Sequence, residues 1–144
     1  MIPLALKRFV FLAIPALMLV MALFHFGLEM VHLDLAGAVA SLQRAPAAWL
    51  VAATWFLEAL ALTAFYLLLE GRAGDSRWLT GVLAGWIAWV FRGPLLVVSV
   101  ATLAALPARP WWNLALSWWA AYTVCGLVLA ALAGPGPESA SERP

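Results

Sequence analysis

Four long apolar runs dominate this sequence, and they constrain its fold more than any other feature. They cover residues 4–26, 49–69, 78–106 and 112–133. An α-helix rises 1.5 Å per residue, so about 20 apolar residues cross the roughly 30 Å hydrocarbon layer of a bilayer. The runs show no alternation with a period of two, which the strands of a membrane barrel require. The sequence therefore predicts an all-α membrane protein with a bundle of four transmembrane helices.

Composition supports a single membrane domain. The chain is 66% hydrophobic and only 10% charged, whereas soluble domains carry about 25% charged residues. Almost no polar linker separates the runs, so we expect one domain over residues 1–134. Residues 135–144 are polar and rich in Pro, Ser and Glu, which predicts a disordered tail.

The segment between the first two runs is too long for a tight turn. Between residues 27 and 45, apolar residues recur at spacings of three and four, the pattern of a helix with one apolar face. These residues are Leu28, Val31, Leu35, Val39 and Leu42. We expect an interfacial helix here.

Basic residues near the span ends predict the orientation. If the N-terminus lies inside, the loops and chain ends on the inner side carry Lys7, Arg8, Arg72, Arg77 and Arg143. The opposite loops carry only Arg44 and Arg109. Because Lys and Arg are enriched on the cytoplasmic side, both termini are predicted to face the cytoplasm. The composition, rich in Ala, Leu and Trp, suits a bacterial inner membrane.

Several functional classes are excluded or disfavoured by what the sequence lacks. The net charge is +1 and the basic residues are scattered, so nucleic acid is not an expected partner. The single cysteine, Cys125, excludes an internal disulfide and a multi-cysteine metal site. The common nucleotide-binding, zinc-protease and hydrolase motifs are missing. No motif ties the chain to a known family.

Two charged residues lie deep inside the apolar runs. Glu58 is near the middle of the second run and Arg92 near the middle of the third. A charge at the centre of a transmembrane helix costs about 2.5–3.5 kcal/mol to insert, so two of them are expected to pair. The pair either fixes how the two helices dock or forms a site for a ligand, a proton or an anion.

Residues around Arg92 extend this candidate site. Gly93 and Pro94 follow it directly, and a proline inside a helix removes a backbone hydrogen bond, which predicts a kink or a break. Trp86 and Trp89 lie on nearly the same helical stripe as Arg92. Their indoles could cover the guanidinium or stack on a flat ligand such as a quinone, but packing between helices or against lipid is the simpler explanation.

Two further patterns allow both structural and functional explanations. Gly81 and Gly85 form a small-xxx-small pair that favours close helix packing, either within the chain or against a partner. His25, Glu29 and His32 are spaced to share one helical face and could ligate a metal. However, ionisable residues are common at a span end, and Gly27 interrupts the segment, so an ordinary interfacial role is favoured.

The function expected from these features is that of a small accessory, assembly or scaffolding subunit of a larger membrane protein complex. Its partners would be the lipid bilayer and other membrane subunits, or further copies of itself. A bound lipid or quinone is a further possibility, and the sequence favours a non-enzymatic role. The alternatives are a small transporter or membrane-embedded enzyme using Glu58 and Arg92, and a metal-binding protein using His25, Glu29 and His32.

Overall fold

The computed structural model describes residues 4–27, 48–70, 72, 76–103 and 108–134, and within these ranges it contains helices and no strands. Four stretches are long and apolar enough to cross a membrane. They are Ala5–Gly27, Ala48–Leu69, Arg77–Ser99 and Trp111–Leu132. The all-helical class and the four apolar helices are thus confirmed. The predicted interfacial helix and the polar tail lie outside the described residues.

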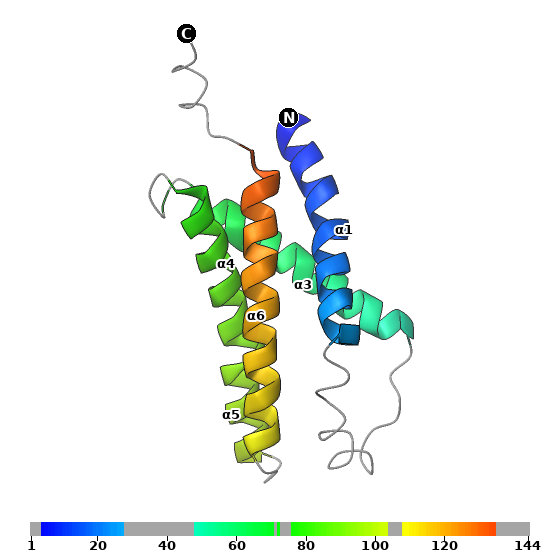
Figure 1. The fold of residues 1–144 in the computed structure, drawn as a ribbon, viewed down its shortest axis with the longest axis vertical. Coiled ribbons are helices and arrows are strands. Elements are labelled where there is room, and N and C mark those ends of the chain that lie inside the picture. Colours follow the sequence, from blue (N-terminus) through cyan, green and yellow to red (C-terminus); the bar gives the residue numbers. More distant parts are fainter. Residues whose placement is uncertain (1–3, 28–47, 71, 73–75, 104–107, 135–144) are drawn as a thin grey trace.

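The helices form a bundle in which the first and last helices meet (Figure 1). Helix α1 (Leu4–Gly27) packs against α3 (Ala48–Leu69) and α6 (Ala108–Leu132). Helix α4 (Arg77–Arg92) runs along α6 and also contacts α3, which passes obliquely behind the other helices. The start of α1 and the end of α6 lie at the same end of the bundle.

The third apolar run forms two helices rather than one. Helix α4 ends at Arg92, and α5 (Pro94–Leu103) begins after Gly93 and continues beside α6. The Gly93 N–H donates to the Trp89 carbonyl at 2.7 Å, and the Val97 N–H donates to the Gly93 carbonyl at 2.9 Å. Pro94 has no N–H to continue this series. The predicted break is therefore present, while the run beyond Leu103, predicted to continue to residue 106, lies outside the described residues.

Glycines allow α4 and α6 to pack with their backbones in direct contact. A Cβ atom at Gly81 would overlap the Gly126 carbonyl, and one at Gly85 would overlap the Tyr122 carbonyl. The reverse also holds, because a Cβ atom at Gly126 would overlap the Gly81 carbonyl. The small-residue face of the third run is therefore used for packing within this chain.

The apolar core lies where α1, α3, α4 and α6 come together. Its largest fully buried side chains include Leu17 of α1, Tyr66 of α3 and Leu129 of α6. Cys125 belongs to the same core and is fully buried. Thr63 of α3 is also buried, and its hydroxyl donates its hydrogen to the Ala59 carbonyl at 2.8 Å. The hydroxyl of Thr63 is thus satisfied within its own helix.

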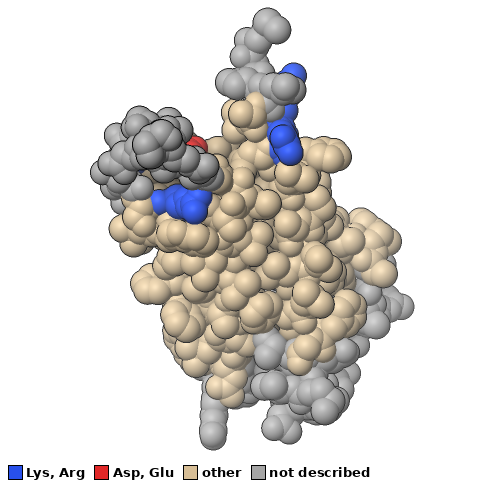
Figure 2. Space-filling model, turned by 45° about the horizontal axis from the view of Figure 1, so that its top comes forward, with Lys and Arg blue, Asp and Glu red and all other residues tan. Residues whose placement is uncertain are grey.

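Four basic residues share one end of the bundle. Lys7 and Arg8 lie in the first turns of α1, Arg72 follows α3, and Arg77 is the first residue of α4. Figure 2 shows the blue Lys and Arg side chains near this end, with an almost uncharged surface over the other described residues in view. Arg72 also donates to the Leu68 carbonyl at the end of α3, where a positive charge is favourable.

Candidate functional site

Glu58 and Arg92 meet between α3 and the end of α4. The Nε atom of Arg92 lies 3.1 Å from Oε1 of Glu58. Glu58 is about 15 Å along the helix from either end of α3, so the contact sits at the middle depth of that helix. Oε1 is buried and has no hydrogen-bond donor among the described residues, so the contact is a close ion pair without hydrogen-bond alignment.

Tyr122 of α6 completes the contacts of the carboxylate. Its hydroxyl donates to Oε2 of Glu58 at 2.9 Å, and the tyrosine is 5% exposed. The ion pair therefore connects three helices, because Glu58, Arg92 and Tyr122 belong to α3, α4 and α6. Sequence reasoning missed Tyr122. One signal could have found it, namely that it is a hydroxyl-bearing side chain near the middle of the fourth apolar run.

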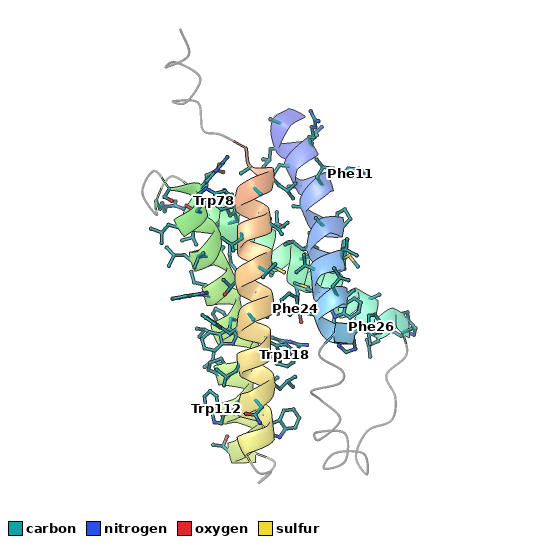
Figure 3. The ribbon with its side chains drawn as sticks, in the orientation of Figure 1. Phe11, Phe24, Phe26, Trp78, Trp112 and Trp118 are labelled. Atoms are coloured by element: carbon teal, nitrogen blue, oxygen red, sulfur yellow. The ribbon has the colours of Figure 1, made fainter. Side chains whose placement is uncertain are left out.

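Trp118 of α6 covers the guanidinium of Arg92. The Cζ atom lies 4.7 Å from the centroid of the Trp118 ring, within the range of a cation–π contact. Figure 3 shows Trp118 on the side of α6 that faces α1. The indole that covers Arg92 therefore comes from the fourth run and not from Trp86 or Trp89, which the helical spacing suggested.

Trp86 and Trp89 instead bind α6. The Trp89 indole N–H donates to the Ala115 carbonyl at 2.7 Å, and the Trp86 indole N–H donates to Oγ1 of Thr123 at 3.2 Å. The close approach of the α4 and α6 backbones brings both indoles within reach of the neighbouring helix. Gly93 makes room for Trp89, because a Cβ atom there would lie 2.8 Å from the indole nitrogen. Gly93 thus permits the Trp89 contact as well as the helix break.

The predicted metal ligands are only partly described. His25 is exposed at the end of α1, and its ring packs edge-on against Phe26 and Trp55 at centroid distances of 5.4 Å for each. Glu29 and His32 lie outside the described residues. Within the described ranges no group of three His, Cys, Asp or Glu side chains could hold a metal ion. The structure therefore places His25 in an aromatic cluster.

The contacts around the ion pair hold its charged groups in place. Glu58 and Arg92 neutralise each other, Tyr122 holds one carboxylate oxygen, and Trp118 covers the cation. Arg92 is nevertheless 39% exposed at its side chain, compared with 20% for Glu58. The site thus has a mostly buried carboxylate and a partly exposed guanidinium, an arrangement that can fix helices together and can also donate hydrogen bonds to an acceptor.

Replacing Tyr122 with phenylalanine is expected to destabilise the bundle by about 2 kcal/mol, because hydrogen bonds to charged groups contribute about 1.5–3 kcal/mol. Tyr66→Phe is the matched control, since Tyr66 is buried on α3 and its hydroxyl makes no hydrogen bond among the described residues. Unfolding by SDS in mixed micelles, followed by helical circular dichroism, measures both. Equal losses for the two variants would show that the Glu58 contact contributes nothing specific.

Comparisons with protein-family models, with curated proteins and with solved structures find no match to this chain.

Proposed function

We propose that this chain is an integral membrane protein that serves as an accessory, assembly or scaffolding subunit of a larger membrane protein complex. Its four apolar helices suit insertion into a bilayer. The two charged residues within its described spans, away from their ends, engage each other inside the chain. A surface that is apolar and aromatic then remains for lateral association.

One observation carries this proposal, namely a pair of tryptophans on the outside of the bundle at middle depth. Trp86 is 42% exposed and Trp119 is 41% exposed, and their ring centroids lie 6.1 Å apart. Trp86 is about 14 Å along α4 from its start. Indoles prefer the headgroup region of a membrane to its centre, whereas Trp is enriched in the buried centres of protein interfaces. This pair is therefore suited to contact with another membrane subunit.

Native mass spectrometry after gentle extraction from the source membrane tests the proposal. We expect stoichiometric partner subunits with the wild-type chain, and their loss when Trp86 and Trp119 are both replaced by leucine. The control is Trp49→Leu, because Trp49 is 71% exposed but lies at the start of α3. Recovery of the wild-type chain as a lone, ligand-free monomer would contradict the proposal.

The proposed location is a bacterial inner membrane with both termini in the cytoplasm. It is supported by the gathering of Lys7, Arg8, Arg72 and Arg77 at one end of the bundle. A cysteine introduced at Ser76 is expected to resist a membrane-impermeant maleimide in intact cells, while one at Asn113 reacts. Both positions are exposed in the structure. The reverse labelling pattern would invert the orientation.

A second candidate function is that of a small transporter or membrane-embedded enzyme working at Glu58 and Arg92. It is favoured by the helix break at Gly93–Pro94, directly beside the ion pair, because transporters bind substrates at interrupted helices near the membrane centre. Under this function, Glu58→Gln abolishes the activity of the protein that remains folded. Under the accessory-subunit function, any loss of assembly follows the loss of folded protein.

A further inference from the structure

The guanidinium of Arg92 has hydrogen-bonding capacity that the chain does not use. Arginine carries N–H donors on Nε and on both Nη atoms. Its nearest polar contact is that of Nε with Oε1 of Glu58 at 3.1 Å, and among the described residues none of its donors makes an aligned hydrogen bond. The second carboxylate oxygen, Oε2, is engaged by Tyr122. The Nη donors therefore need an acceptor from elsewhere.

The open side of Arg92 lies where water is scarce if the helices span a bilayer. Arg92 is about 22 Å along the helix from Arg77 and about 10 Å from Ser99, the two ends of the span. Its side chain is 39% exposed, and at this depth the exposure is to hydrocarbon. Hydrocarbon offers no hydrogen-bond partner, so polar groups there must be satisfied by protein or by a bound molecule.

Apolar side chains that lie close to Arg92 in the sequence are exposed. Phe91, which precedes it on α4, is 62% exposed, and Leu95, three residues later on α5, is 49% exposed. Trp118 covers one face of the guanidinium. The exposed residues near Arg92 along the chain are therefore apolar, and the residue that contacts its guanidinium face is aromatic.

The charges of Glu58 and Arg92 favour an uncharged hydrogen-bond acceptor over an anionic one. Glu58 already neutralises Arg92, so a second anion would have to bind beside a carboxylate that is only 20% exposed. The second anion and the Glu58 carboxylate would then repel each other strongly, because the dielectric constant is low in this environment. An uncharged carbonyl oxygen accepts hydrogen bonds without this repulsion.

From these observations we propose that Arg92 forms a binding site for an uncharged, lipid-soluble molecule that presents a carbonyl oxygen. The Nη atoms donate to the carbonyl, Glu58 holds the guanidinium in place, and the apolar body lies in the hydrocarbon beside Phe91 and Leu95. Both a quinone ring and the ester of a neutral lipid have this chemistry. The inference is independent of the accessory-subunit function and would stand if that function failed.

Native mass spectrometry of the full-length protein in detergent tests the site with three probes of similar length. The probes are a short-chain benzoquinone, a short-chain diacylglycerol and decanoate. Wild-type protein is expected to bind at least one of the two neutral probes saturably, and at least tenfold more tightly than decanoate. Binding of the quinone alone assigns a ring carbonyl, and binding of the diacylglycerol alone assigns a lipid ester. Tighter binding of decanoate, or saturable binding of neither neutral probe, would overturn the proposal.

Two variants connect the binding to Arg92. Arg92→Lys keeps the charge opposite Glu58 but lacks the planar guanidinium, and it is expected to weaken binding of the neutral probe at least tenfold. Arg77→Gln is the matched control, because Arg77 lies at the other end of α4 with its guanidinium 5.1 Å from the Trp78 ring centroid. It is expected to leave binding unchanged. If Arg92→Lys binds the neutral probe as tightly as wild-type protein, the probe does not bind at Arg92. The same conclusion follows if Arg92→Lys and Arg77→Gln weaken binding equally.

Discussion

Replacing Gly126 with alanine is expected to destabilise the bundle by about 3 kcal/mol, at the upper end of the usual cost of overpacking. The added Cβ atom would overlap the Gly81 carbonyl and lie 2.7 Å from its carbonyl carbon. Because the obstacle is backbone rather than a flexible side chain, the contact is relieved only when α4 and α6 move apart. That movement would also weaken the indole hydrogen bonds of Trp86 and Trp89 to α6.

Gly27→Ala is the control for this prediction. A Cβ atom at Gly27, the last residue of α1, meets nothing within 4 Å. Its stability is expected to stay within about 0.5 kcal/mol of wild type, as for most surface substitutions. SDS-induced unfolding in mixed micelles compares the two variants. If Gly126→Ala is as stable as Gly27→Ala, the backbones of α4 and α6 are not in direct contact.

The second large effect is expected at the ion pair. Removing one partner of a buried pair costs about 3–5 kcal/mol because the other charge is left uncompensated. Arg92 is partly exposed, so we expect about 3 kcal/mol, the lower end of that range, for Arg92→Met and for Glu58→Gln alike. The double variant should lose much less than the sum of the two, since it leaves no unpaired charge.

Arg8→Met and Glu70→Gln serve as the matched control cycle, because both side chains are exposed near the charged end of the bundle. Their effects are expected to be small and additive, as for independent surface sites. Additive losses at Glu58 and Arg92 would mean that the two charges act separately. The ion pair would then not be what joins α3 to α4.

Much of the fold could be predicted from the sequence because an apolar run long enough to cross a bilayer predicts a helix of the same length. The bounds predicted for the first, second and fourth runs agree with the spanning stretches in the structure to within one residue at each end. The Gly93–Pro94 dipeptide also predicted the break, since proline cannot continue the backbone hydrogen bonding. The oblique crossing of α3 was not predictable, because hydropathy contains no information on helix directions.

In the candidate site, only the residues whose charge costs free energy inside an apolar run could be predicted from the sequence. Glu58 and Arg92 stand out because charges are expensive in apolar runs, and the structure places them together. Tyr122 and Trp118 do not stand out, because neutral side chains carry little cost there. Gly126 could have been found through Ala130, since the two form a small-xxx-small pair that matches Gly81 and Gly85.

The contacts of Glu58 with α4 and α6 also determine when the chain can complete its fold during synthesis. Translation proceeds at about 5–20 residues per second, so Arg92 is made about 2–7 s after Glu58. Tyr122, 64 residues after Glu58, follows it by about 3–13 s. During this interval α3 carries a carboxyl group without its partners, which disfavours a stable position in the hydrocarbon. If the chain inserts into a bilayer as it is made, we therefore expect α3 to reach a stable position there only after α6 has been synthesised.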